Sequence, residues 1–124
     1  MKSLSDFSLI IATERSVAET KLLMVLESLL GSVVPAHCTL SASTYDPSTT
    51  AIAAVARKAN LSTHRVTVPK AGSNRHIVLL RINERLAADA QGCLVLWDGK
   101  DGRIKHLVGA AQFHGIPVWS FPLD

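Results

Sequence analysis

Short apolar runs alternate along the chain with longer segments in which apolar residues recur every three or four positions. Such runs are typical of buried strands, and the longer segments are typical of helices that pack one face against a core. The pattern predicts five strands, over 8–12, 34–40, 64–68, 93–97 and 116–121. It predicts four helices between them, over 16–31, 46–61, 75–90 and 102–114.

Polar residues mark the expected starts of two helices. Ser16 with Glu19 three residues later has the spacing of a capping box, in which each side chain accepts from a free backbone N–H. Asp46 followed by Pro47 predicts the next helix start, because Asp accepts from free N–H groups and Pro lacks one that would go unpaired. Gly31 is expected to end the first helix.

Strands separated by helices need crossover connections, which indicate a parallel sheet covered on both faces. We therefore expect an α/β fold, a single Rossmann-like three-layer domain over residues 1–124 with about five mostly parallel strands. Ligands of such sheets bind beyond the carboxyl ends of the strands, where the strand order reverses. Four loops are expected at that edge: 13–16, 41–46, 69–75 and 98–103.

Composition supports one globular domain, since 48% of the 124 residues are hydrophobic and 19% are charged. No run approaches the roughly 18 apolar residues of a membrane span, and the chain start lacks the features of a signal peptide. We expect a cytoplasmic protein that does not bind membranes. The five histidines and two cysteines show no metal-ligand spacing, so neither a metal nor another cofactor is expected.

Charge is unevenly distributed around the net value of +3. Residues 1–50 carry three basic and five acidic side chains, whereas residues 51–124 carry ten basic and five acidic ones. A basic second half is compatible with an anionic ligand, a nucleic acid or an acidic partner chain, and also with an ordinary solvated surface.

The stretch CLVLWDGKDGRIKHL, residues 93–107, is a candidate phosphate loop. It places Gly99 and Gly102 after a buried strand and at a helix start, where backbone N–H groups and the helix dipole can receive an anion. Asp98 and Asp101 would repel phosphate unless they cap the helix or bind sugar hydroxyls. Loop chemistry alone leaves a ligand site and a plain turn equally supported. The chain lacks G-x-G-x-x-G and G-x-x-x-x-G-K-[ST], which argues against a standard dinucleotide enzyme or P-loop ATPase.

A family resemblance favours the ligand site. The chain resembles the C-terminal half of the SLOG superfamily, and within it the YspA-like proteins, at Asn83, Trp97-Asp98-Gly99, Gly102, Ala110-Ala111 and Gly115-Ile116-Pro117-Val118. The resemblance implies a Rossmann-like domain that binds a nucleotide or nucleotide-derived ligand. In the family's first loop this chain keeps Arg15 but not the glycine, and in the second it keeps Asp46 but not the glycines. The family's Arg-Asn pair is Arg81-Ile82-Asn83 here, which makes Arg75 an equal candidate for the anion contact.

The resulting expectation is a nucleotide-like small molecule bound without catalysis. Gly99 and Gly102 would offer backbone N–H groups, arginines would pair with phosphate, and Asn83, Asp46 or Asp98 would bind the sugar or base. The complete set of expected ligand-binding residues is Thr13, Glu14, Arg15, Ser43, Asp46, Arg75, Arg81, Asn83, Asp98, Gly99, Gly102 and Arg103.

Three alternatives remain open. Phosphoribohydrolases that resemble this fold carry Pro-Gly-Gly-x-Gly-Thr-x-x-Glu, and this chain has Arg103 for the threonine and His106 for the glutamate, so an enzyme would need His106 or Glu14 as its acid or base. A nucleic-acid partner would use a basic stripe, although the few aromatic residues offer little stacking. That stripe would comprise Arg57, Lys58, Arg65, Lys70 and Arg75. Assembly, with a homodimer as the expected oligomer, is the third alternative.

Overall fold

The computed structural model describes residues 7–67 and 74–123. It confirms the α/β prediction, since five parallel strands alternate with four helices. The elements are β1 (Ser8–Thr13), α1 (Glu19–Leu29), β2 (Thr39–Ser43), α2 (Thr49–Ala59), β3 (Ser62–Val66), α3 (Arg75–Asp89), β4 (Gly92–Leu96), α4 (Gly102–Phe113) and β5 (Val118–Phe121).

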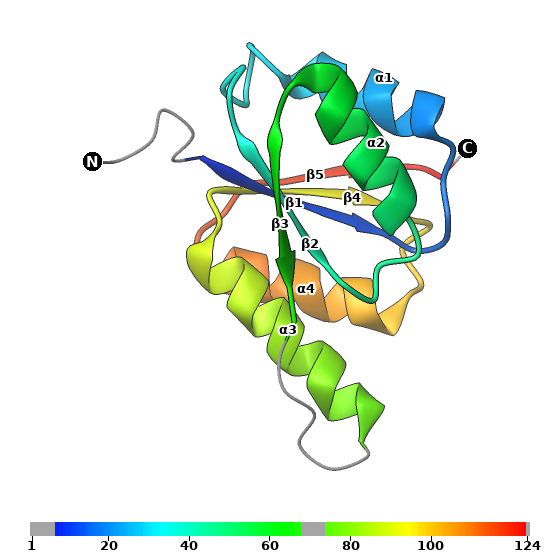
Figure 1. Cartoon of the computed structure of the whole chain (residues 1–124). Helices are drawn as coiled ribbons and strands as arrows, with labels where there is room; N and C mark the ends of the chain where they lie inside the picture. The colour runs from blue at the N-terminus through cyan, green and yellow to red at the C-terminus, as the bar shows by residue number, and fades with distance from the viewer. Residues whose placement is uncertain (1–6, 68–73, 124) are drawn as a thin grey trace.

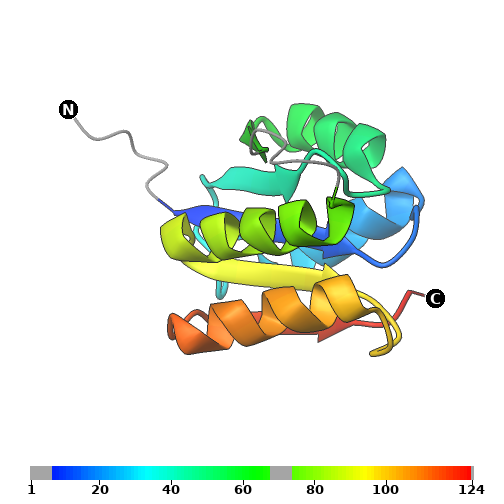
Figure 2. The same ribbon diagram turned by 90° about the horizontal axis from the view of Figure 1, so that it is seen from below.

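The strand order is β3-β2-β1-β4-β5, so the direction of winding reverses between β1 and β4. Helices α1 and α2 cover one face of the sheet and α3 and α4 cover the other (Figure 1). Figure 2 shows α3 and α4 side by side, seen from their own face. Thr13 pairs with Leu96 at the carboxyl ends of β1 and β4, which places the loops that follow these strands at the switch point.

Each face of the sheet has its own apolar core. Alternate residues of β1 serve the two cores: Leu9 and Ile11 face α1 and α2, whereas Ile10 and Ala12 face α3 and α4. All four are almost completely buried. Burial on both faces explains why the strand reads as a continuous apolar run.

The second strand lies further along the chain than predicted. The structure places it at Thr39–Ser43 instead of 34–40, because Val34 belongs to a turn in which Gly31 N–H donates to the Val34 carbonyl. Val34 is nevertheless buried in the core, so an apolar loop residue imitates a strand residue in the sequence. In β2, the hydroxyls of Ser41 and Ser8 are hydrogen-bonded at 2.6 Å, which satisfies a polar side chain inside the sheet.

Both predicted caps are wrong. Helix α1 begins at Glu19 after Ala18, without a side-chain cap, and the Glu19 carboxylate pairs instead with Lys58 of α2. Helix α2 begins at Thr49 after Ser48, so Asp46 lies outside the helix and its carboxylate is free to bond elsewhere. Within residues 7–67 and 74–123, no helix has the length and apolar character needed to cross a bilayer.

Gly92 is predicted to be intolerant of a side chain. A Cβ atom built at Gly92 would lie 2.7 Å from Trp119 Cζ3 and 3.1 Å from Phe7 Cζ. We expect Gly92→Ala to lower the free energy of unfolding by about 1–3 kcal/mol, because the two rings must move within a packed core.

Gly109→Ala is the matched control, since a Cβ built there in α4 meets no atom within 4 Å apart from its chain neighbours and the helix's own backbone. It should raise stability by up to about 1 kcal/mol through helix propensity. Urea denaturation measures both, and equal stability of Gly92→Ala and the wild type would contradict the packing.

Candidate functional site at the switch point

Two loops leave the sheet where its strand order reverses. The Glu14 N–H donates to the Leu96 carbonyl at 3.0 Å, which extends the ladder between β1 and β4 by one residue. Beyond it, the Asp98 N–H donates to Glu14 Oε1 at 3.3 Å. These contacts bring together two of the loops that the sequence predicts at one edge, 13–16 and 98–103.

The carboxylate of Asp46 ties the end of β1 to the connection between β2 and α2. Its side chain is 1% exposed. Asp46 Oδ2 accepts from the Thr13 N–H at 2.9 Å, and Oδ1 accepts from Thr13 Oγ1 at 2.8 Å and from the Ser48 N–H at 2.9 Å. A buried carboxylate is tolerated when such donors surround it. Asp46 is therefore built into the edge of the sheet.

Ser48 belongs to the same network, and the sequence reasoning missed it. It is 1% exposed, its hydroxyl is hydrogen-bonded to Thr13 Oγ1 at 2.7 Å, and it accepts from the Val17 N–H at 3.1 Å. The sequence pattern that could have revealed Ser48 is the Asp-x-Ser spacing, since an Asp side chain often accepts from the backbone N–H two residues later. Together, Asp46 and Ser48 fix both the end of β1 and the loop that follows it.

Arg103 reaches across the switch point from the first turn of α4. Its Nη2 donates to the Thr13 carbonyl at 2.7 Å, and its Nη1 lies 3.8 Å from Asp46 Oδ2. The arginine side chain is 15% exposed. In the described part of the chain, every fully buried side-chain nitrogen or oxygen has a hydrogen-bond partner. Nε and Nη1 of Arg103 have no hydrogen bond to the described residues, so neither atom is completely buried.

Asn83 is buried behind Arg103. Its Nδ2 donates to the Arg103 carbonyl at 2.9 Å and lies 3.3 Å from His106 Nδ1. The asparagine side chain thus joins α3 to the first turn of α4 and fixes the backbone that carries Arg103. His106, at the position of the glutamate in the enzymatic pattern, lines an open groove between α3 and α4 with Glu84 and Phe113.

The exposed rim of the site carries opposite charges. Arg15 Nη1 lies 3.7 Å from Asp98 Oδ2, and the two side chains are 58% and 44% exposed. Gly99 has φ +85°, a conformation that favours glycine. Asp101 caps α4, because its Oδ1 accepts from the Ile104 N–H at 3.0 Å. Gly102 is exposed at the helix start.

The side chains of the remaining candidates form no hydrogen bond or ion pair with Arg103, Asp46 or Asp98. Ser43 is buried and its Oγ accepts from the Tyr45 N–H at 3.0 Å. Arg75, in the first turn of α3, lies over the Tyr45 ring at 5.3 Å. Arg81 is exposed on α3 and forms no hydrogen bond or ion pair with the residues described. The structure therefore brings Thr13, Glu14, Arg15, Asp46, Asp98, Gly99, Gly102 and Arg103 to the switch point, with Asn83 behind them.

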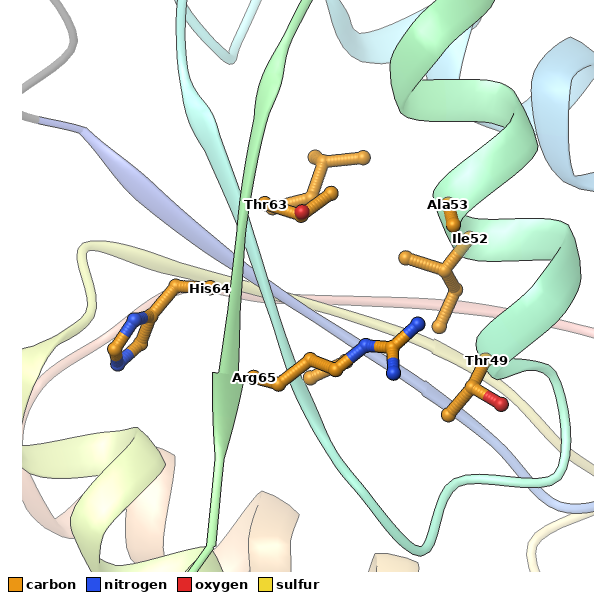
Figure 3. A pocket seen from close by; sticks show the side chains of 8 residues that line it. Thr49, Ile52, Ala53, Thr63, His64 and Arg65 are labelled. Carbon is orange, nitrogen blue, oxygen red and sulfur yellow. The ribbon is translucent and has the colours of Figure 1, made fainter.

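The residues of the basic stripe are dispersed. Lys58 pairs with Glu19, and Lys70 lies outside the described residues. Arg65 extends from β3 toward Thr49 of α2, whereas His64 points to the other side of the strand (Figure 3). The cavity beneath Arg65 has a volume of about 10 Å³, which is barely enough for one water molecule.

Burial dominates the electrostatics of the buried acids. It raises the pKa of Asp46 above the ordinary value of 3.8, against the lowering effect of the Thr13 and Ser48 hydrogen bonds and of Arg103. It also raises the pKa of the Cys38 thiol, and that of Cys93 to about 12, which keeps both cysteines protonated and unreactive. No three His, Cys, Asp or Glu side chains of the described segments converge in a way that could hold a metal ion.

The chain matches no protein-family model, and no similar sequence is found among curated proteins. The resemblance to the SLOG superfamily stays a prediction. Functional inference depends on the geometry at the switch point.

The Thr13 hydroxyl is expected to contribute measurably to stability. Thr13→Val keeps the shape of the buried side chain but removes the bonds to Asp46 and Ser48, and should lower the free energy of unfolding by about 1–2 kcal/mol. Thr63→Val on the exposed strand β3 is the matched control and should change it by less than about 0.5 kcal/mol. Equal effects of the two substitutions in urea denaturation would show that the Thr13 network contributes nothing specific.

Removal of the Arg103 charge should raise the pKa of Asp46 further. Arg103 favours the ionised carboxylate, so Arg103→Met leaves burial less opposed. When the pKa of a carboxyl is higher in the folded state than in the unfolded state, its protonation stabilises the fold. This stabilisation is complete below the unfolded-state pKa and is lost as pH rises through the folded-state pKa. The variant should extend that loss to higher pH. NMR titration of the Asp46 carboxyl carbon measures its titration midpoint. The control Arg15→Met should leave this midpoint unchanged. An unchanged midpoint in Arg103→Met would refute the coupling between Arg103 and Asp46.

Proposed function

We propose that the chain binds a nucleotide or nucleotide-derived ligand at the switch point, through its phosphate, without catalysing a reaction. The observation that carries the proposal is the guanidinium of Arg103, which lies between β1 and α4 and is only partly occupied by protein acceptors. Ligands of parallel sheets bind at this edge.

The guanidinium donors of Arg103 that have no protein acceptor favour the binding of an anion. One N–H bonds to the Thr13 carbonyl, and the Asp46 oxygen is 3.8 Å away, beyond the range of a strong hydrogen bond. The Asp46 carboxylate already accepts three hydrogen bonds from Thr13 and Ser48. A phosphate could therefore take up the remaining guanidinium donors in the bidentate geometry that arginine supports.

The neighbouring backbone adds to this attraction. The first N–H groups of a helix have no acceptor within the helix, and Asp101 takes up that of Ile104. Gly102 follows the cap, exposed, at the positive end of the α4 dipole. Arg15 lies on the opposite loop, 3.7 Å from Asp98. Two arginines and a helix start thus belong to the segments that meet at the switch point.

The ligand class comes from the resemblance together with these contacts. Asn83, Asp46, Gly99 and Gly102 occupy the matching positions of the SLOG pattern, whose members bind nucleotide-like ligands. Binding without catalysis is proposed because both candidate acid–base groups are engaged within the protein. His106 Nδ1 lies against Asn83, and Glu14 accepts from the Asp98 N–H.

Thermal denaturation with AMP, ADP and cyclic AMP at millimolar concentration tests the proposal. We expect at least one nucleotide to raise Tm, since a ligand that binds the folded state stabilises it. Arg103→Met should weaken binding by at least about tenfold and Arg15→Gln by a few-fold, in line with buried and exposed charge contacts.

Arg57→Gln, an exposed arginine of α2, is the control and should leave affinity unchanged. Because Arg103 also contacts Thr13, each variant must first give the wild-type circular dichroism spectrum. Failure of every nucleotide to stabilise the folded wild type would overturn the proposal. Release of free base from AMP would overturn its non-catalytic part.

A further inference from the structure

An open groove lies beside the switch point, at the carboxyl ends of β4 and β5. Its volume is about 510 Å³, within the range of pockets that bind small molecules. It is lined by Trp97, Asp98, Gly99, Ser120, Phe121 and Pro122. Asp98 and Gly99 belong also to the rim of the switch point, so the groove borders the proposed phosphate site.

Trp97 presents an oriented aromatic surface to this groove. Its indole Nε1 donates to Ser120 Oγ at 2.9 Å, and its ring packs against the core beneath α3 and α4. That hydrogen bond satisfies the single polar group of the ring. With its polar group satisfied, the indole contacts a ligand through its apolar ring, which the bond to Ser120 of β5 holds in place.

We infer that the groove binds the aromatic base of the ligand, with the base stacked on Trp97. The inference rests on the proposed function and deepens it by assigning a place to each end of the ligand. Base–aromatic stacking is worth about 1–3 kcal/mol per base, enough to influence affinity strongly. Phe121 and Pro122 also line the groove, Phe121 from the face of the sheet that α1 and α2 cover.

The charge of Asp98 determines which end of the ligand lies in the groove. Its carboxylate is 44% exposed in the lining of the groove, where it would repel a phosphate and accept from an exocyclic amino group or a ribose hydroxyl. On its other side Asp98 faces Arg15. The phosphate thus lies toward Arg15 and Arg103, and the base lies toward Trp97. Gly99 lies on the rim between the two and adds no side chain there.

Comparison of AMP with ribose 5-phosphate tests the assignment on the native chain. The two probes share sugar and phosphate, and only AMP carries a base. Calorimetry should give AMP an affinity at least about tenfold higher, as one stacked base predicts. Trp97→Leu should reduce the affinity for AMP to that for ribose 5-phosphate and leave the latter unchanged.

Fluorescence provides a readout that does not alter the groove. The chain has two tryptophans, and Trp119 packs over Gly92 at the opposite end of the sheet, so Trp119→Phe leaves Trp97 as the single reporter. AMP should quench its emission, whereas ribose 5-phosphate should not.

The outcomes separate the two proposals. Equal affinities for both probes, with no change in Trp97 emission, would overturn the base site and leave the phosphate site standing. Binding of neither probe, nor of any other nucleotide, would overturn both. Quenching of Trp97 by AMP together with weaker binding of ribose 5-phosphate supports both.

Discussion

The carboxyl side chain of Asp46 accepts three hydrogen bonds from Thr13 and Ser48 in a place where water scarcely reaches it. An unpaired carboxylate there would cost several kcal/mol, so the end of β1 and the start of α2 are constrained to keep their donors around it. This constraint fixes the Thr13 carbonyl, which receives Arg103, and Asn83 in turn holds the Arg103 backbone. One continuous path of polar contacts therefore crosses the sheet edge from α2 to α3.

Some residues along this path of polar contacts contribute both to the stability of the fold and to the proposed ligand site. Arg103 braces the end of β1 and also offers the donors on which anion binding is proposed, so one side chain contributes to both. Trp97 has a similar double position, since one part of its ring packs in the core and another lines the groove. A ligand held between the two would bridge loops that the fold otherwise joins through Glu14 and Asp98.

Periodicity was sufficient to predict the alternation of strands and helices, because burial on two faces imposes it directly. It misplaced β2, since Val34 is an apolar loop residue and Ser41 is a polar strand residue with a partner on β1. Local capping rules failed at Glu19 and Asp46 because both side chains bond to residues distant in the sequence, which no local pattern records. The loops 13–16 and 98–103 were correctly grouped at one edge, whereas most of the predicted loop 69–75 lies outside the described residues. The reach of Arg103 to Thr13, 90 positions away, required the folded chain.

Strand β3 closes one side of the sheet, and four of its five residues are exposed. Its outer backbone edge could in principle template pairing with another chain. Arg65 and His64 project to opposite sides of it (Figure 3), so an added strand would meet a cationic or bulky polar side chain on either face. Arg65, part of the basic surplus in the second half of the sequence, thus lies where a charge opposes edge-to-edge pairing of strands, an effect that involves no ligand.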